Sequence, residues 1–160
     1  MERGASVSGE SLRTNKQKLG EKGELLVARK CLCPRCKRQQ TFRRLPSNFK
    51  CADVICDFCG YLAQVKTHTT PTIDKLPTKL LGAAWRVQRD RMRAGIYFPL
   101  FIVQIDRRGR SSIFYLSAAL QTPAMFVARK PLSSKARRAG WTGFVYDLER
   151  ASKNSIVKIS

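Results

Sequence analysis

Acidic side chains are scarce in this sequence. Its 160 residues include 11 Asp and Glu against 31 Lys and Arg, which gives a formal net charge of +20. A positive field of this strength attracts polyanions, and DNA or RNA is the partner that it favours. The basic residues do not line one amphipathic helix, so an anionic membrane surface is the less favoured alternative.

Long apolar runs are also missing. No stretch of 18 or more apolar residues occurs, and the first twenty residues lack the apolar region of a secretory signal. We therefore expect a cytoplasmic protein that has no membrane partner. A chain of this length with 43% hydrophobic residues can bury a real core. We expect residues 1–10 to be disordered and residues 11–160 to form a single domain.

The hydrophobic pattern predicts an α/β fold with a mixed sheet flanked by helices. Its spacing indicates helices over residues 11–30 and 80–92. Alternating or continuous apolar runs predict strands over residues 52–56, 61–67, 96–106, 111–117, 144–148 and 155–160. The intervening segments at 67–72 and 127–143 read as loops, and the second of these is strongly basic.

Four of the six cysteines fall into two C-x-x-C pairs that are separated by 19 residues. The four are Cys33, Cys36, Cys56 and Cys59. Four thiolates complete a tetrahedral Zn²⁺ site and leave no open position, so we expect the zinc to be structural. An iron–sulfur cluster is the alternative metal centre, whereas a redox site would need only one pair. Cys31 and Cys51 fall outside the spacing, and we expect them to be packed side chains.

A possible catalytic group surrounds the second cysteine pair. Gln64 and Lys66 lie two residues apart on a predicted strand, so they share one face. Asp53 lies on the preceding strand and can turn to the same face if the two strands pair. A carboxylate, a second oxygen ligand and a lysine suit Mg²⁺-dependent phosphodiester hydrolysis, with the lysine orienting or deprotonating the attacking water. The alternative is that Asp53 makes only local hydrogen bonds.

Glu24 lies on the first predicted helix, beside Leu25 and Leu26. If that helix packs near the hairpin, Glu24 can add a further oxygen to the metal or position a water molecule. The helical periodicity is equally typical of a solvated glutamate, so both interpretations stand.

These residues together resemble the DpnI-type, Dam-replacing family of methyl-directed restriction endonucleases and its PD-(D/E)xK nuclease core. The similarity is carried by "CPRC", "CDFC", "ADVIC", "QVK", "AAWRVQRDR" and "ARKPLSSKARRAGWTGFVYDL". It covers the chain from about residue 18 to residue 148, and K-P-L-x-x-x-A-R-R-A-G-W is its most specific motif.

The resemblance implies a PD-(D/E)xK core in which the zinc knuckle is inserted at the active-site hairpin. It places Asp53, Gln64 and Lys66 at the catalytic-core positions and Glu24 at the position of the family's helix glutamate. Magnesium would be the catalytic ion, bound by Asp53 and Gln64. The expected substrate is double-stranded DNA carrying N6-methyladenine, such as methylated GATC, rather than a small molecule.

The basic segment at 127–143 matches the family's recognition loop. Its candidate DNA-binding residues are Arg129, Lys130, Lys135, Arg137, Arg138 and Trp141. Cations bind phosphates and guanine edges, and an indole face suits the adenine methyl group in the major groove. The alternative for Trp141 is a core anchor beneath the strand that follows.

Two departures from the family pattern bear on function. Residue 64 is a neutral glutamine where an acid is usual, and this change either preserves cleavage or marks a module that binds methylated DNA without cutting it. The chain ends at Ser160, and we expect no winged-helix domain after the nuclease domain. A basic zinc-ribbon protein that binds RNA is the third interpretation.

Overall fold

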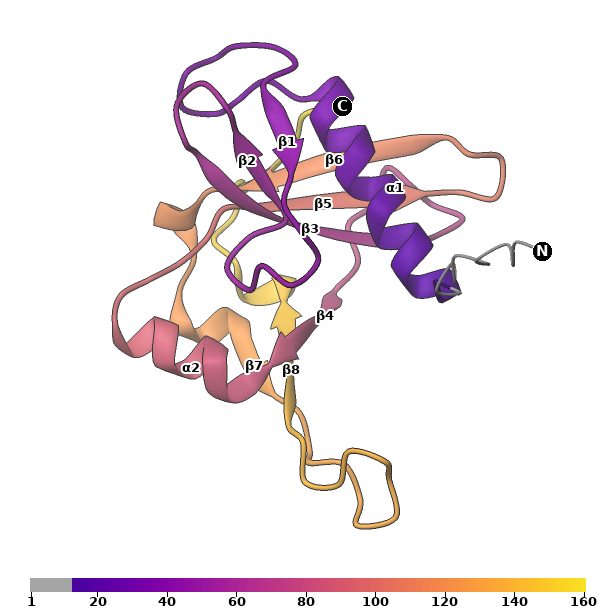
Figure 1. Ribbon diagram of the computed structural model, residues 1–160, viewed down its shortest axis with the longest axis vertical. Coiled ribbons are helices and arrows are strands. Elements are labelled where there is room, and N and C mark those ends of the chain that lie inside the picture. Colours follow the sequence, from indigo (N-terminus) through magenta and orange to yellow (C-terminus); the bar gives the residue numbers. More distant parts are fainter. Residues whose placement is uncertain (1–12) are drawn as a thin grey trace, which may run out of the picture.

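The computed structural model describes residues 13–160, so the expectation of disorder at residues 1–10 lies outside the described residues. The described chain is a mixed α/β protein with a central mixed sheet and two helices (Figure 1). No helix in this part of the chain is long and apolar enough to cross a lipid bilayer.

The central sheet has six strands in the order β1-β2-β3-β5-β6-β9. Their bounds are β1 Phe42–Arg44, β2 Val54–Cys56, β3 Leu62–Thr69, β5 Leu100–Ile105, β6 Ser111–Leu116 and β9 Ile156–Lys158. Strands β3 and β5 pair in parallel, and every other neighbouring pair is antiparallel. The predicted mixed sheet is therefore confirmed.

A second sheet of three antiparallel strands packs against the first, in the order β4-β8-β7. Its strands are β4 Lys79–Ala84, β8 Gly143–Asp147 and β7 Phe126–Ala128. Helix α2, Trp85–Arg93, follows β4 directly, and three short 3-10 turns lie at Ala118–Leu120, Pro123–Met125 and Leu148–Arg150.

Strand β5 divides the core into two halves, because all six of its residues are buried and alternate between the faces of the sheet. Phe101, Val103 and Ile105 pack with helix α1, Asn15–Lys30, on one face. Leu100 and Ile102 pack with the three-stranded sheet on the other face. The central sheet is thus covered on both faces.

Helix α1 begins at Thr14, whose side chain accepts a hydrogen bond from the Gln17 amide in a capping box. It lies unusually close to β3 at Gly23. A Cβ atom on Gly23 would lie 1.7 Å from Thr67 Oγ1, so only glycine allows this approach. Gly23, a residue type that is unfavourable within a helix, therefore sets the distance between α1 and the sheet.

Three sequence-based expectations are wrong in part. The helix predicted over 80–92 begins only at Trp85, because Lys79–Ala84 pairs with β8 as a strand. The loop predicted from residue 67 starts later, since β3 stays paired with β5 as far as Thr69. Strand β7 extends into the segment from residue 127 that we expected to be a loop, and β1 lies in a segment for which we predicted no strand. In each case pairing with a distant strand decides the local structure.

Candidate active site and metal centre

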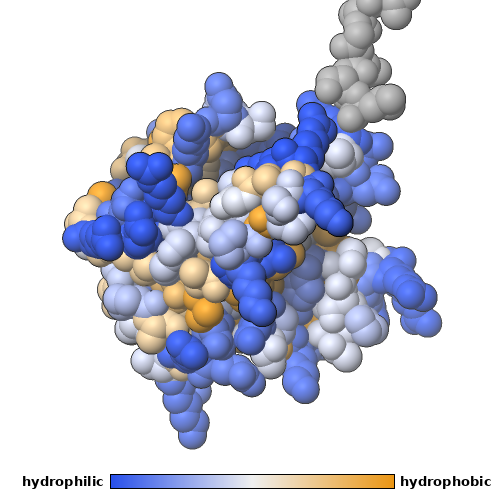
Figure 2. Space-filling view, turned by 90° about the horizontal axis from the view of Figure 1, so that it is seen from below, coloured by the Kyte–Doolittle hydropathy of each residue, from blue (hydrophilic) through white to orange (hydrophobic). Residues whose placement is uncertain are grey.

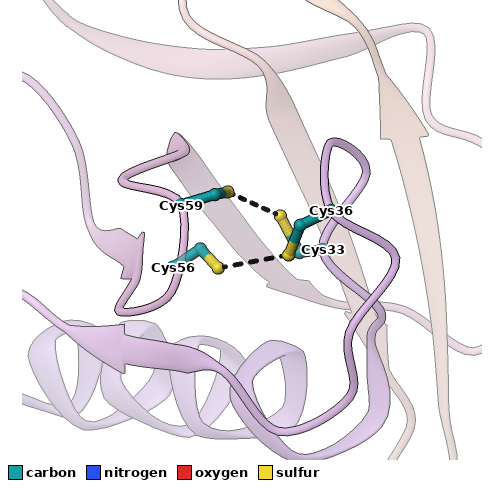
Figure 3. Close-up of side chains that lie close together, drawn as sticks. All are labelled: Cys33, Cys36, Cys56 and Cys59. Carbon is teal, nitrogen blue, oxygen red and sulfur yellow. Dashed lines mark hydrogen bonds between the residues drawn. The ribbon is translucent and has the colours of Figure 1, made fainter.

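Two short turns bring four cysteines together at one end of the central sheet (Figure 3). Cys33 and Cys36 follow α1, and Cys56 and Cys59 lie in the turn that joins β2 to β3. All four sulfur atoms lie within 4.8 Å of one another. The closest pairs are Cys33–Cys59 at 3.5 Å and Cys36–Cys56 at 3.7 Å.

The two turns share one backbone pattern. The amide after each second cysteine donates to the carbonyl of the first, from Lys37 to Cys33 at 2.9 Å and from Gly60 to Cys56 at 2.8 Å. Lys37 and Gly60 both have positive φ, at 62° and 75°. Each turn therefore points its two thiols to the same side, and the turns face each other (Figure 3).

This donor set suits a zinc ion. A tetrahedral centre with Zn–S bonds of about 2.3 Å places its sulfurs about 3.8 Å apart, close to the shortest spacings observed here. The four-cysteine cluster can therefore bind zinc with little rearrangement. Cys31 is not part of it: that side chain is buried in the core beside α1, and burial raises the pKa of its thiol to about 11. Cys51 is half-buried and also lies outside the cluster.

The cysteine turn fixes the strands that carry the candidate catalytic residues. Strand β2 pairs with β3 only through Val54 and Ile55, whereas β3 continues for several more residues beside β5. The sheet therefore forks just beyond this short ladder. Asp53 lies at the fork, and its Oδ2 accepts a 2.7 Å hydrogen bond from the Val65 amide that the divergence would otherwise leave free.

Gln64 and Lys66 lie on the face of β3 that points to the second sheet, since their register partners Leu100 and Ile102 belong to that half of the core. The Gln64 amide is held at both ends. Its Nε2 donates to the Cys51 carbonyl at 3.3 Å, and its Oε1 accepts from the Tyr146 hydroxyl at 2.9 Å. Strand β2 pairs with β3, which is the condition under which we expected Asp53 to turn to the same face as Gln64 and Lys66.

Lys66 is held in a setting that favours its neutral form. Burial lowers the pKa of its amine, and the negative charge of Asp53 offsets part of that shift. The same carboxylate raises the pKa of Glu24, although burial of Glu24 is the larger cause. The negative charge of Asp53 therefore affects the pKa of Glu24 on one side of the fork and of Lys66 on the other.

Glu24 and Asp53 line a cleft of about 600 Å³ between α1 and the segment after β1. Gln64 and Lys66 do not line this cleft; they lie on the sheet face beyond Asp53. Glu24 accepts a hydrogen bond from Arg44 Nε at 2.8 Å, so it is neither a freely solvated glutamate nor fully buried. Helix α1 does pack near the hairpin, as its contacts with β1 and β3 require.

Four further residues shape this site, and sequence reasoning did not identify them. Arg44 bridges Glu24 and Glu21, and Arg13 closes the network with a 2.6 Å contact to Glu21. Tyr146 holds Gln64 from the second sheet. These contacts join residues that are 8 to 82 positions apart, which is farther than a local sequence pattern reaches.

The basic loop between β7 and β8, residues 129–142, projects away from the body of the molecule (Figure 1). It carries every residue that we expected to contact DNA: Arg129, Lys130, Lys135, Arg137, Arg138 and Trp141. The five cations are exposed, and none of them forms an ion pair within the described residues. Figure 2, which views the molecule from the side of this loop, shows hydrophilic side chains over much of the surface.

Trp141 lies at the neck of the loop and belongs to neither core cluster. The Arg138 guanidinium stacks over its ring, 4.5 Å from the centroid. Its far edge lies over Gly143, where a Cβ atom would come within 2.8 Å of the indole. The side chain is half-buried, so one part of the ring supports the loop while the rest stays open.

Comparison with known families supports the resemblance drawn from the sequence. The sequence model described as "DpnI: Dam-replacing family" matches residues 7–160, which is nearly the whole chain. This family implies a methyl-directed function related to restriction, which suggests a nuclease and DNA as the partner. The chain belongs to the Dam-replacing family, DpnI.

Proposed function

We propose that this protein is a Mg²⁺-dependent endonuclease with a PD-(D/E)xK core that cleaves double-stranded DNA at short adenine-methylated sites such as methylated GATC. The observation that carries the proposal is the fork between β2 and β3, where Asp53 acts on Glu24 to one side and on Lys66 to the other. A carboxylate between a second acid and a lysine whose pKa is lowered by burial suits phosphodiester hydrolysis.

The oxygen donors at the fork fit magnesium. Asp53 has one carboxylate oxygen engaged by the Val65 amide and a second with no hydrogen-bond partner among residues 13–160. Gln64 Oε1 accepts one hydrogen bond and keeps a second lone pair. Asp53 and Gln64 would therefore hold the ion, and Glu24 offers a further oxygen. When bound, Mg²⁺ would lower the pKa of a water molecule and stabilise charge on the phosphate.

The protein's own groups would then divide the work. Lys66 accepts a proton from the attacking water or orients that water, which its lowered pKa favours. The water oxygen bonds to phosphorus as the bond to the leaving sugar oxygen breaks. Arg44 holds Glu24 in place and also donates to Glu21. The four-cysteine cluster, loaded with a structural zinc, fixes the turn between the strands that carry Asp53 and Gln64.

The loop at 129–142 would read the substrate. Five exposed cations supply contacts to phosphates, and the open part of Trp141 supplies an apolar surface for the N6-methyl group of adenine. Such a methyl group projects into the major groove, where an exposed loop can reach it.

One observation favours a second function, a module that binds methylated DNA without cutting it. Gln64 is neutral, and Cys51 and Tyr146 already hold both ends of its amide. A ligand of this kind binds magnesium more weakly than a carboxylate.

Incubation with methylated and unmethylated plasmid, with and without Mg²⁺, tests the proposal. We expect cleavage only of methylated plasmid and only with the metal. Selective binding to methylated plasmid without nicking in Mg²⁺ or Mn²⁺ would favour the binding module, and equal binding to both plasmids with no cleavage would contradict both functions.

A further inference from the structure

An aromatic side chain stands exposed at the tip of the four-cysteine end. Phe58 lies between Cys56 and Cys59, and 58% of its surface is accessible to solvent. The Arg38 guanidinium stacks over its ring, 3.7 Å from the ring centroid. The arginine covers one face of the ring and leaves the rest open. A core residue would not be left in this position, because its burial would stabilise the fold.

The charges around Phe58 are almost all positive. Arg35, Lys37 and Arg38 are exposed and lie within the first cysteine turn or directly after it. None of them forms an ion pair with a carboxylate among residues 13–160. The acid at this tip, Asp57, is neutralised by Arg43 at 3.1 Å. The surface therefore combines an open aromatic ring with unpaired cations.

We propose that this tip, formed by Arg35, Lys37, Arg38 and Phe58, is a second nucleic-acid contact that binds unpaired bases. The open part of the Phe58 ring stacks on a base, so that the base, the phenyl ring and the Arg38 guanidinium form one stack. Lys37 and Arg35 bind the flanking phosphates. Exposed aromatic rings among cations bind single strands in this sequence-tolerant way.

The tip is separate from the loop at 129–142, since the two lie at opposite ends of the molecule (Figure 1). A short oligonucleotide can occupy one end without reaching the other. The inference does not depend on cleavage, so it can fail or succeed independently of the proposed nuclease activity.

Binding of an unmethylated single-stranded oligodeoxynucleotide of about eight nucleotides to the full chain tests the proposal, with fluorescence anisotropy at fixed salt as the readout. Phe58→Ala should weaken binding about tenfold, and Phe58→Trp should retain it. Phe49→Ala is the matched control, because Phe49 is also exposed, at 44%, in the same segment but outside the cysteine turns. This control should bind like the wild type.

Lys37→Gln should lower the salt dependence, reducing the slope of log affinity against log salt by about 0.7. The proposal is overturned if Phe58→Ala binds the single strand like the wild type. It is equally overturned if Phe58→Ala weakens a duplex of the same sequence as much as the single strand, or if Phe49→Ala shows the same loss.

If Phe58→Ala loses its metal or its fold, two other variants decide the matter. Phe58→Leu keeps an apolar side chain but has no ring face, so it should fold and still bind the single strand weakly. In Phe58→Trp, a stacked base should quench indole emission beyond any change that the wild type shows. Wild-type binding by Phe58→Leu, or no extra quenching in Phe58→Trp, would overturn the proposal.

Discussion

The charged side chains of the cleft beside α1 and those of the loop at 129–142 differ in whether they have bonding partners within the protein. In the cleft, each acid is matched: Asp53 is bonded to the Val65 amide, and Glu21 and Glu24 are bridged by Arg44. In the loop, five cations are exposed, and none of them pairs with a carboxylate among residues 13–160. An acid that is bonded to a partner is held in one geometry, and catalysis requires such a fixed geometry. A cation without a carboxylate partner remains available to bind a phosphate of the DNA.

The difference extends to how each region is anchored. The fork that carries Asp53 is tied to the cysteine turn, to α1 and to the second sheet through Tyr146. The loop holds itself by local hydrogen bonds, such as those from Leu132 to Trp141 at 2.9 Å and from Gly140 to Leu132 at 3.0 Å. We therefore expect changes in the cleft to affect cleavage and stability, and changes in the loop to affect binding.

The largest effect should come from removing the lysine at the fork. Lys66→Ala should lower the rate of Mg²⁺-dependent cleavage by about a thousandfold, because no other amine lies beside Asp53 on β3. Binding to DNA should stay close to wild type, since the net charge of +20 supplies most of the affinity. Single-turnover cleavage and anisotropy measure the two quantities, and a parallel loss of both would refute the division of roles.

Loss of the metal should come next. Cys36→Ser, or chelation of the wild-type protein, should lower the free energy of unfolding by several kcal/mol, because the four thiols tie the end of α1 to the turn between β2 and β3. Cys51→Ser is the control and should keep its metal content. Thermal unfolding and elemental analysis decide the matter, and a chain without zinc that unfolds like the wild type would rule out a structural metal.

The cleavage rate and the affinity for DNA should also depend differently on pH. Burial lowers the pKa of Lys66 in the folded protein, and the neutral amine accepts a proton. The rate should therefore rise with pH and level off below the ordinary lysine value of about 10.4. The charged side chains of the loop are arginines and exposed lysines, so DNA binding should change little over the same range. A rate that follows binding at every pH would contradict the assignment of Lys66.

Part of the candidate site could be predicted because its sequence signals are local. The spacing within each C-x-x-C pair indicates the cysteines that can bind a metal, and the two-residue period of a strand puts Gln64 and Lys66 on one face. What could not be predicted depends on distant partners. Strand β4 exists because β8 pairs with it, and Arg44 reaches Glu24 only because β1 lies beside α1.

Within the loop, different substitutions should affect phosphate binding and recognition of the methyl group separately. Arg137→Gln should weaken binding to methylated and unmethylated duplexes alike, and should reduce the salt slope by about 0.9 if Arg137 contacts one phosphate. Trp141→Ala should lower the preference for methylated DNA by roughly tenfold, since each buried methyl group contributes about 1 kcal/mol. Competition binding at fixed salt measures both. A sharp fall in stability with an unchanged preference would make Trp141 a structural residue.

The smallest effect compares two glycines that share the left-handed backbone conformation, which other residues adopt only with strain. Gly60 in the cysteine turn and Gly140 in the loop have φ of 75° and 77°, and a Cβ atom at either would meet nothing within 4 Å. Gly60→Ala should lower the free energy of unfolding by about 1 kcal/mol. Gly140→Ala should leave it nearly unchanged, because the projecting loop can relax locally. Equal losses in urea unfolding would show that the loop is as firmly anchored as the turn.

We propose that residues at the fork cleave DNA and that the loop at 129–142 recognises the methylated site. One paired measurement on Lys66→Ala and Trp141→Ala tests this division most directly. Each variant is given the same methylated and unmethylated duplexes, and both affinity and single-turnover cleavage are recorded. We predict that Lys66→Ala keeps the methylated-to-unmethylated affinity ratio and loses cleavage, while Trp141→Ala at saturating DNA keeps cleavage and loses the ratio. Loss of both properties in either variant, with its fold intact, would contradict the account.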